Sequence, residues 1–281
     1  VGDLVMPNFE SKYAALREKH LELVKLYPDI DFDLEAEEAK WFESIEVLKS
    51  IPQVDGVYYI NNAIKSGKKI LAEGAQGSML DIDFGTYPYV TSSNTITSGV
   101  CNGLGIAPNK IGEVIGIAKA YCTRVGSGPF PTELFDEYGE KLAHIGQEFG
   151  ATTGRPRRCG WIDIPQLNYC IMLNGVTQLV ITKADVLNDF EAIQVGTKYR
   201  YDGMEQDQLP YDLDTIKVTP IYEQHEGWLC DLEGMTDFDQ LPAKLIDYLQ
   251  NIQDLLGTPI TMVSTGPERT KLIVREKAPV A

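Results

Sequence analysis

The sequence predicts an α/β fold in which helices flank a mainly parallel central sheet, with a helical portion at the N-terminus. Two observations support this prediction: apolar strand-like segments alternate with helical segments over most of the chain, whereas residues 10–65 carry only helical patterns. Parallel strands that helices cover on both faces are short and almost continuously apolar, as residues 178–182 and 258–263 are. We therefore expect a mainly helical portion over residues 1–68 and an α/β portion over residues 69–281.

The helical portion is predicted from its composition and from two prolines. Residues 12–27 and 34–48 are rich in Ala, Leu, Glu and Lys, which are strong helix formers. Pro28 and Pro52 follow closely and mark the ends of the two segments. No pattern typical of catalysis occurs here, so we expect this portion to contribute packing and a charged, solvated face.

The α/β portion begins where the pattern changes, at Lys69. Its predicted strands are apolar and bounded by turn residues: 70–77, which runs into a glycine-flanked loop, 178–182, 192–201 and 258–263. Its predicted helices are 112–121, 137–149 and the amphipathic segment 241–256. Asp202-Gly203 follows the third strand and predicts a tight hairpin turn. Ligands of parallel sheets bind beyond the carboxyl ends of the strands, so the residues after each strand are candidates for a site.

Charge and composition exclude several classes of protein. The formal net charge of −16 at pH 7 opposes nucleic-acid binding, because affinity for phosphate backbones comes from clustered Lys and Arg. No apolar run reaches the ~20 residues that span a bilayer, and the N-terminus carries no signal-peptide pattern. The five cysteines are scattered without metal-ligand spacing, and the three histidines lie outside any catalytic motif. We expect a cytoplasmic protein with reduced thiols that binds neither nucleic acid nor membrane.

The strand at 178–182 ends in Thr182-Lys183-Ala184-Asp185, a pattern that recurs in proteins that bind guanine nucleotides. A carboxylate at a strand end can accept hydrogen bonds from the ring N–H and the exocyclic amine of guanine, a pair of donors that adenine lacks. The aliphatic stem of Lys183 can lie along the face of the base. Since four-residue patterns arise by chance, a plain solvated turn is the alternative.

A second strand end supports the guanine interpretation. The strand at 258–263 runs into Ser264-Thr265-Gly266-Pro267, where small residues leave backbone N–H groups free to contact the guanine carbonyl oxygen. The phosphate half of such a site is absent, because the chain contains no G-x-x-x-x-G-K-[ST] motif. We expect the phosphate loop to lie upstream of Val1.

The densest positive cluster of this acidic chain lies at residues 149–158. Backbone N–H groups and threonine hydroxyls stand there beside guanidinium groups, which suits a ligand that carries carboxylates and phosphates. The candidate residues are Thr152, Thr153, Gly154, Arg155 and Arg157. For the neighbouring Arg158 a structural role is the alternative. A basic surface turn that pairs with nearby acids is the alternative for the whole cluster.

An amide and a polar stretch precede this cluster. Gln76 stands between glycines after the strand predicted at 70–77, where its amide can donate to a carbonyl oxygen on which charge develops. The alternative is an ordinary turn glutamine. Residues 83–95 are rich in hydroxyl and amide side chains, which either cap turns or line a polar pocket.

Six segments resemble the adenylosuccinate synthetase family in order and in rough spacing: 73–83, 85–95, 123–133, 149–155, 182–185 and 264–270. The resemblance runs from Val1 to near the C-terminus and is weakest before Lys69. It implies a carbon–nitrogen ligase that condenses IMP with L-aspartate to adenylosuccinate while GTP becomes GDP and phosphate, in the AMP branch of purine biosynthesis. In the family, the 6-oxygen of IMP takes the γ-phosphoryl group of GTP, and the amine of aspartate then displaces phosphate.

The resemblance also implies a role for each matching residue. Those implied to contact IMP are Gln76, Thr91 and Arg155, with Gln76 near the 6-oxygen in a supporting catalytic role. Those implied to contact L-aspartate are Ala151, Thr152, Thr153, Gly154, Arg155 and Arg157. Those implied to bind GTP are Arg157, Lys183, Ala184, Asp185, Ser264, Thr265 and Gly266.

Several family features are absent from these 281 residues. They are the Gly-Asp-Glu-Gly-Lys-Gly-Lys loop with the catalytic aspartate, the histidine that acts as general acid, and a Thr-Thr-Gly-Arg-Gly segment for IMP. The family's Mg²⁺ ligands lie in the same missing part, so no metal ligand is expected in this chain. We expect one incomplete catalytic domain, inactive alone, of a homodimeric enzyme. The alternatives are a non-catalytic guanine- or purine-nucleotide-binding module and a G-protein-like switch, and the clamp at 152–158 disfavours the switch.

Overall fold

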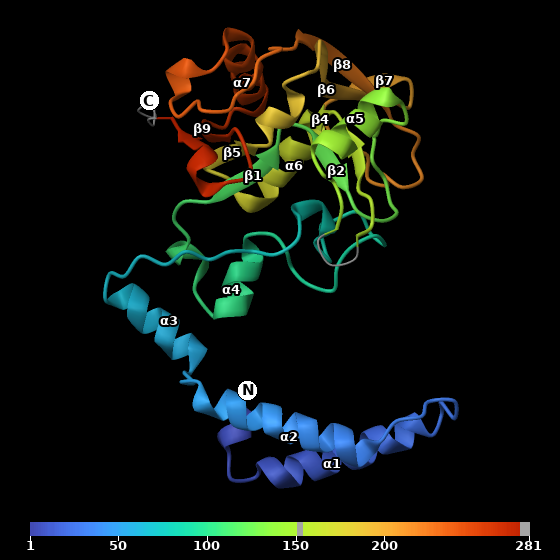
Figure 1. The fold of residues 1–281 in the computed structure, drawn as a ribbon, viewed down its shortest axis with the longest axis vertical. Helices are drawn as coiled ribbons and strands as arrows, with labels where there is room; N and C mark the ends of the chain where they lie inside the picture. Colours follow the sequence, from blue (N-terminus) through green and yellow to red (C-terminus); the bar gives the residue numbers. More distant parts are fainter. Residues whose placement is uncertain (151–153, 276–281) are drawn as a thin grey trace. The chain divides into compact units, whose positions relative to one another are not determined.

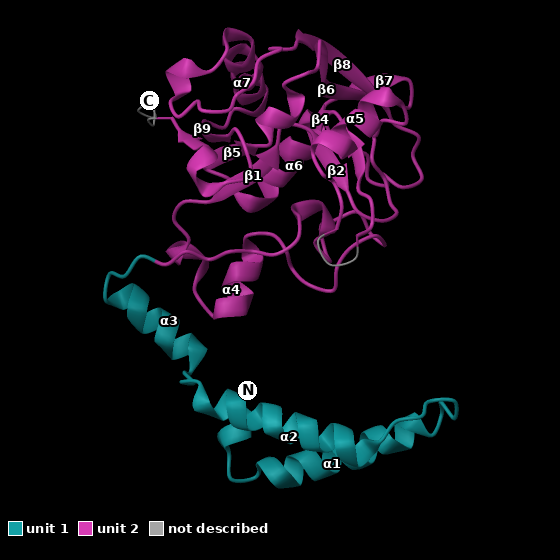
Figure 2. Ribbon diagram, viewed as in Figure 1, with its two compact units in different colours: residues 1–69 teal, residues 70–281 magenta. Residues whose placement is uncertain are grey.

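The computed structural model describes residues 1–150 and 154–275. Contacts within the chain divide it into two compact units, Val1–Lys69 (unit 1) and Ile70–Ala281 (unit 2), which Figure 1 and Figure 2 show. None of the helices in the described part of the chain is long and apolar enough to cross a lipid bilayer. That portion 1–68 is a helical part without a site, and that portion 69–281 carries the ligand-binding loops, stays a prediction.

Unit 1 is helical, as its composition predicts. Its elements are the 3₁₀ helix η1 (Gly2–Val5) and the α-helices α1 (Phe9–Val24), α2 (Leu34–Ser50) and α3 (Gly56–Lys65). The side chain of Asp33 accepts a hydrogen bond from a backbone N–H in the first turn of α2, and Asp55 does the same for α3. Such caps satisfy backbone donors that a helix start leaves unpaired.

Helices α1 and α2 lie side by side and are held by aromatic contacts. The rings of Tyr13 and Trp41 stack with their centroids 4.9 Å apart, and Phe42 packs edge-on against Tyr13 at 5.0 Å. The guanidinium of Arg17 pairs with the carboxylate of Glu38 across the same contact. The hairpin therefore combines aromatic packing with one cross-helix ion pair.

The central sheet of unit 2 has the strand order β1-β5-β9-β10. Its members are β1 (Ile115–Lys119), β5 (Gln178–Thr182), β9 (Ile260–Ser264) and β10 (Leu272–Val274). Strand β5 pairs in parallel with β1 on one side and with β9 on the other, while β10 is antiparallel to β9. The first four residues of β5 are buried, as expected for an interior strand covered on both faces. The predicted α/β class with a mainly parallel sheet is confirmed.

The remaining strands form two smaller sheets. One pairs β2 (Cys122–Arg124) with β3 (Arg158–Gly160). The other is built on β6 and contains β4 (Ile162–Asp163), β6 (Ala192–Tyr201), β7 (Met204–Gln206) and β8 (Thr219–Glu226). Asp202 and Gly203 join β6 to β7 with φ of 51° and 74°, the positive values that a tight two-residue hairpin needs. The predicted hairpin is confirmed.

The α-helices in the described part of unit 2 are α4 (Ser98–Leu104), α5 (Glu137–Ile145), α6 (Ile164–Asn174) and α7 (Ala243–Leu256). Helices α5, α6 and α7 bury residues in one core, whereas no residue of α4 is buried. The short 3₁₀ helices are η2 (Ser78–Leu80), η3 (Pro108–Lys110), η4 (Ala184–Leu187), η5 (Phe238–Gln240) and η6 (Arg269–Lys271). Leu245, Leu249 and Ile252 of α7 are spaced on one helical face and are buried with Ile181 of β5 in the same cluster. Gly257, with φ 60°, ends α7 in a left-handed conformation.

Two predicted elements are wrong. Residues 112–121, predicted to be a helix, contain β1 instead, because Ile115–Lys119 pair with β5. The approach is close: a Cβ added to Gly116 would lie 2.9 Å from side-chain atoms of Leu179 and of Val176. A glycine between isoleucines suits such a strand better than a helix.

The second wrong element is the strand predicted within residues 70–77, which the structure shows as irregular chain. Ile70 and Leu71 are 41% and 87% exposed, so neither face of the segment is buried. A strand needs a partner and a buried face, and local apolar composition supplies neither. The helix predicted at 137–149 exists but ends at Ile145.

The core of unit 2 predicts a large difference between two positions of α7. Ile252 is 0% exposed and Leu255 is 36% exposed. We expect Ile252→Ala to lower the free energy of unfolding by about 2–5 kcal/mol, because it leaves a cavity. Leu255→Ala, the matched control, should cost less than about 1 kcal/mol. Urea unfolding followed by tryptophan fluorescence measures both losses. A Trp41→Phe background removes the tryptophan of unit 1, so that Trp161 and Trp228 report the unfolding of unit 2. Equal losses would contradict the expected difference.

Candidate functional site

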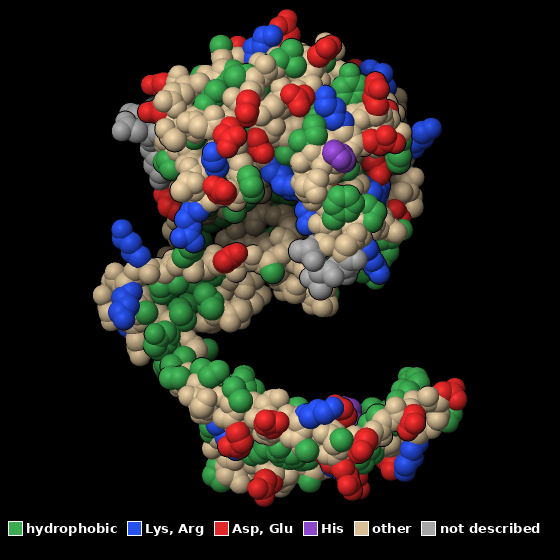
Figure 3. All heavy atoms as spheres, in the orientation of Figure 1, with side chains coloured by type: hydrophobic (Ala, Val, Ile, Leu, Met, Phe, Trp, Pro, Cys, Tyr) green, Lys and Arg blue, Asp and Glu red, His purple; other side chains and the backbone are tan. Residues whose placement is uncertain are grey.

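The carboxyl ends of three parallel strands lie next to one another in unit 2. Since β5 pairs with both β1 and β9, the segments after Lys119, Thr182 and Ser264 start from the same edge of the sheet. A hydrogen bond from Ala120 N to Thr182 O (2.8 Å) joins two of these ends. On the face drawn in Figure 3, Lys and Arg side chains border a hollow in unit 2. This edge is where ligands of open parallel sheets bind.

Asp185, just after β5, has a buried oxygen without a partner. Its Oδ1 has no hydrogen-bond donor among residues 1–150 and 154–275. Burial raises the pKa of the Asp185 carboxyl above its ordinary value, and the backbone N–H of Asp185 and the nearby Lys183 oppose that rise only in part. A buried acceptor without a donor costs about 1–3 kcal/mol. The geometry therefore favours a donor that a ligand supplies.

Lys183 has a left-handed backbone, with φ 59°. Residues with a Cβ seldom adopt this conformation, and the surroundings must hold them in it. The side chain is held at its far end, because Nζ donates to Gly146 O (2.6 Å) and to Glu148 Oε1 (2.7 Å). With both ends fixed, the aliphatic stem of Lys183 follows one defined path.

The loop after β9 is also tightly held. Ser264 Oγ donates to Gly266 O (2.8 Å), and Thr265 N donates to Lys271 O (2.9 Å). A Cβ on Gly266 would lie 3.1 Å from Lys271 Cγ, a close approach that a larger residue would make only if the Lys271 side chain shifted. Strand β9 contacts η4, the turn that carries Ala184 and Asp185. The two loops predicted to contact guanine are therefore neighbours.

A buried glutamate that sequence analysis did not identify joins three cations at this edge. The Glu148 side chain is 0% exposed. Its carboxylate accepts hydrogen bonds from Lys119 Nζ (2.8 Å to both oxygens), Lys183 Nζ (2.7 Å) and Arg157 Nη1 (2.8 Å). The Tyr121 hydroxyl donates to Oε1 as well. Residues from the ends of β1 and β5 and from the loop before β3 thus meet at one carboxylate. We call these five side chains the Glu148 cluster.

The charges of the Glu148 cluster do not balance. Three cations around one carboxylate leave two positive charges in excess. Burial by itself would raise the pKa of Glu148, but hydrogen bonds from Lys119, Lys183 and Tyr121 bring it down to about 2. Burial lowers the pKa of Lys119, and Glu148 opposes that shift without cancelling it. The excess positive charge makes the cluster suited to an anionic ligand.

The basic loop predicted to clamp anions is described in part. Residues 151–153, the predicted Ala151, Thr152 and Thr153, lie outside the described residues. Gly150 N donates to Arg155 O (2.8 Å) and Gly154 N donates to Gly150 O (2.8 Å), which closes the loop at its base. The Arg155 residue is exposed, whereas Arg157 is partly buried and belongs to the Glu148 cluster.

Arg158 has a structural role. Its Nε donates to Glu133 Oε1 (2.6 Å), and its Nη2 pairs with the other oxygen of the same carboxylate. Its Nη1 donates to the carbonyl oxygens of Gly126 (3.1 Å) and Gly128 (2.8 Å). Arg158 therefore fastens the loop before α5 to strand β3.

Gln76 and Thr91 lie in a loop that a different buried carboxylate organises. Asp81 is 0% exposed. Burial would raise the pKa of Asp81, but four backbone N–H donors hold it below its ordinary value. The donors belong to Asp83, Phe84, Thr95 and Ile96. Gln76 is exposed with φ 70°, and Thr91 Oγ1 donates to Leu80 O (3.1 Å).

Hydrogen bonds from α6 and β2 fasten this loop to the rest of unit 2. Asn174 Oδ1, at the end of α6, accepts a hydrogen bond from Thr97 N (2.8 Å). Arg124 Nη2, at the end of β2, donates to Thr86 Oγ1 (2.9 Å). The structure thus gathers the predicted guanine residues and Arg157 at one sheet edge, while Gln76 and Thr91 occupy a loop with its own anchors.

Sequence analysis missed Glu148, Lys119 and Tyr121. The helix predicted at 112–121 conceals Lys119 as the last residue of a strand, where a polar side chain would be a candidate. Glu148 falls in the last turn of the helix predicted at 137–149, where a glutamate is an ordinary helix residue and predicts no special role. A carboxylate at the start of the basic segment 149–158, just before Phe149, is the signal that could have identified it.

Metal ligands do not converge in the described part of the chain. Among residues 1–150 and 154–275, no three His, Cys, Asp or Glu side chains come together in a way that could hold a metal ion. The described residues therefore do not form, by themselves, the Mg²⁺ site that the family resemblance implies.

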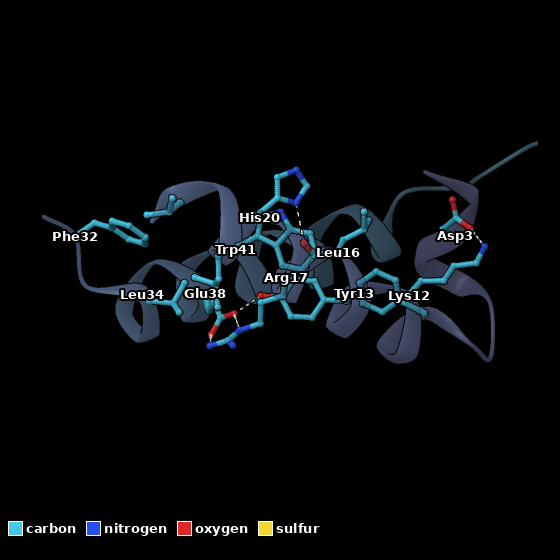
Figure 4. Close-up of a pocket in the computed structure, with 13 residues that line it drawn as sticks. Asp3, Lys12, Tyr13, Leu16, Arg17, His20, Phe32, Leu34, Glu38 and Trp41 are labelled. Carbon is cyan, nitrogen blue, oxygen red and sulfur yellow. Dashed lines mark hydrogen bonds and ion pairs between the residues drawn. The ribbon is translucent and has the colours of Figure 1, made fainter. Parts of the chain in front are cut away.

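Unit 1 contains a pocket of its own. It is bordered by α1 and α2, and Leu16, Leu34 and Trp41 are among the side chains that line it (Figure 4). Its polar groups include the paired Arg17 and Glu38, which satisfy each other. None of the predicted site residues lines it, so it is a gap in the packing of two helices rather than a candidate site.

Comparison with known proteins gives close matches. The family model described as adenylosuccinate synthetase matches residues 1–273. The adenylosuccinate synthetase of Flavobacterium johnsoniae is 51% identical over 276 residues, which are 98% of this chain and 65% of that protein. That of Bacteroides fragilis is 52% identical over 275 residues, covering 98% and 64%. The chain thus spans about 65% of the length of these relatives.

Solved structures also match. The structure of fully ligated adenylosuccinate synthetase from Plasmodium falciparum has a TM-score of 0.88 at 39% identity, covering 96% of this chain and 64% of that chain. The succinoaminodeoxyadenylate synthetase of cyanophage S-2L has a TM-score of 0.51 at 19% identity, covering 83% and 55%. The second likeness shows the fold alone.

The pKa of Glu148 predicts how stability depends on pH. The pKa lies near 2 in the folded protein against an ordinary 4.5, so ionised Glu148 stabilises the fold above pH 4.5 and loses this effect as the pH falls towards 2. We expect Glu148→Gln to be less stable than the parent at neutral pH and to lose less stability over that acid range. Urea unfolding at several pH values measures this, with the exposed Glu140→Gln as control. Parallel pH profiles for parent and Glu148→Gln would contradict it.

Proposed function

Because the chain belongs to the adenylosuccinate synthetase family, we propose that it carries the guanine- and anion-binding parts of an enzyme that condenses IMP with L-aspartate. In the proposed reaction, the 6-oxygen of IMP accepts the γ-phosphoryl group of GTP and GDP forms. The aspartate amine then bonds to the ring carbon that carries this oxygen, the carbon–oxygen bond breaks, and phosphate leaves. The product, adenylosuccinate, belongs to the AMP branch of purine biosynthesis.

The observation that carries the guanine part is the buried Oδ1 of Asp185, which has no donor among residues 1–150 and 154–275. Guanine presents a ring N–H and an amine side by side, whereas adenine does not, so this acceptor favours GTP over ATP. Lys183 supports the base with its fixed stem. The proposed GTP contacts are Arg157, Lys183, Ala184, Asp185, Ser264, Thr265 and Gly266.

The anion part rests on the positive excess of the Glu148 cluster and on the basic loop beside it. Arg157, already held at this edge, can present its remaining donors to a carboxylate or a phosphate. The proposed aspartate contacts are Ala151, Thr152, Thr153, Gly154, Arg155 and Arg157. The proposed IMP contacts are Gln76, Thr91 and Arg155, with the Gln76 amide near the 6-oxygen.

The proposal carries further expectations from the family resemblance: Mg²⁺ as cofactor, a homodimer and a cytoplasmic location. Bound Mg²⁺ would neutralise charge on the GTP phosphates. The described residues do not fit that ion, so their contribution is to bind and orient the nucleotide base and the anionic groups. A non-catalytic module that binds guanine or purine nucleotides is the second candidate.

Guanine specificity can be tested with Asp185→Asn. An asparagine accepts one hydrogen bond but donates the other, so it mismatches the guanine amine and matches the carbonyl oxygen at that position in xanthine. We expect GDP affinity to fall by about tenfold or more and xanthosine diphosphate affinity to rise, since charge-assisted hydrogen bonds contribute ~1.5–3 kcal/mol. Calorimetric titration measures both, with the exposed Asp189→Asn as control. If Asp185→Asn binds GDP as tightly as the parent, the proposed guanine pocket is wrong.

Turnover separates the two candidate functions. We expect the 281-residue chain to bind GDP in preference to ADP without forming adenylosuccinate, because it lacks the phosphate loop, the catalytic aspartate and the histidine acid of the family. The measurement is adenylosuccinate formation with phosphate release, from GTP, IMP and L-aspartate with Mg²⁺. The protein extended to the full length of its relatives should be active. Ordinary turnover by the chain alone would overturn the expectation, and an inactive extended protein would favour the binding module.

A further inference from the structure

The two oxygens of Glu148 serve different parts of the proposed site. Oε1 accepts hydrogen bonds from Lys183 Nζ (2.7 Å), whose stem is proposed to support the base. Oε2 accepts one from Arg157 Nη1 (2.8 Å), which is proposed to bind anions. Lys119 Nζ bridges both oxygens at 2.8 Å and also donates to Thr123 Oγ1 (2.9 Å). One carboxylate is therefore the common partner of a guanine-site residue and an anion-site residue.

Glu148 cannot act on the ligands directly. Its side chain is 0% exposed, so its oxygens are reached only by the groups that already surround it. Two of its cationic partners are partly exposed to solvent: the side chain of Lys183 is 33% exposed and that of Arg157 is 30% exposed. Any influence of Glu148 on binding must therefore pass through the positions of these two cations.

The surroundings of Glu148 are shaped for this contact. A Cβ added to Gly146 would lie 2.3 Å from the Tyr121 hydroxyl, which donates to Glu148. The Gly146 carbonyl oxygen in turn accepts a hydrogen bond from Lys183 Nζ (2.6 Å). Glycine at this position thus lets the tyrosine and the lysine approach the same carboxylate.

We propose that Glu148 is a positioning residue whose carboxylate sets both Lys183 in the guanine pocket and Arg157 in the anion loop, and so links the two subsites through one anchor. The inference deepens the proposed function and rests on it for the identity of the ligands. Without the carboxylate, Lys183 Nζ loses one of the two hydrogen bonds that hold it and keeps only the one to Gly146 O, and Arg157 loses its bond to Glu148. Both subsites weaken together, although neither ligand contacts Glu148.

The test uses the chain with two acid-to-amide variants. Glu148→Gln keeps the shape of the side chain but turns one acceptor into a donor that faces cations. Glu133→Gln is the matched control, because it removes a carboxylate that holds the adjacent Arg158, which is also bound by two carbonyl oxygens. We expect GDP affinity, measured by calorimetry, to fall by about tenfold or more for Glu148→Gln and to change by less than about twofold for Glu133→Gln.

A second variant keeps the test decisive if Glu148→Gln does not fold. Glu148→Gln combined with Lys119→Met removes one cation together with the carboxylate, so two positive charges remain in excess, as in the parent. We expect this variant to fold and still to bind GDP weakly. If it is as thermally stable as Glu133→Gln and binds GDP like the parent, the positioning role is overturned.

A readout without ligand separates this inference from the proposed function. Ammonium and guanidinium hydrogens held by a buried carboxylate exchange slowly with water, so ¹⁵N NMR should show side-chain signals of Lys183 and Arg157 in the parent. We expect both signals to broaden or vanish in Glu148→Gln and to persist in Glu133→Gln. Their persistence in Glu148→Gln overturns the anchor. Their loss in a protein whose parent form does not bind GDP supports the anchor and refutes the proposed guanine site.

Discussion

The hydrogen bonds between the buried carboxylate of Glu148 and its three cationic partners connect the parts of unit 2 that are proposed to bind ligands. A buried charge without partners would be strongly destabilising, and a buried pair that loses one member typically costs about 3–5 kcal/mol. Here the partners come from the end of β1, the turn after β5 and the loop before β3. The carboxylate therefore constrains three separate segments at once, and each segment carries a side chain that the sheet alone would leave free to move.

The parallel sheet supplies the frame for this constraint. Strand β5 lies between β1 and β9, so the segments that follow the three strands begin at one edge. At that edge, Asp185 Oδ1 has no donor within the described part of the chain, and two positive charges are in excess around Glu148. The first is suited to a base with two adjacent donors, and the second is suited to phosphate or carboxylate. Membership of the adenylosuccinate synthetase family joins these two chemistries in one proposed reaction.

Some elements could be predicted because their cause is local. The buried runs that became β5 and β9, the apolar face of α7 and the Asp202-Gly203 turn follow from side-chain spacing and from the freedom of glycine at positive φ. Strand β1 could not be predicted, because its conformation depends on pairing with β5, a segment about 60 residues away in sequence. The strand expected at 70–77 failed for the opposite reason, since no partner buries its apolar residues among those described.

The sequence by itself determined the family, the loops and the types of side chain that they present, because long motifs in a fixed order and strand-end polar residues are properties of the chain. Asp185, Lys183, Ser264 and Arg157 were all identified in this way. Tertiary structure alone decided that Lys183 and Arg157 share a partner, and that this partner is Glu148. The reason is physical: a carboxylate reveals its role only through burial and the cations around it, and those come from segments that meet only when the sheet has formed.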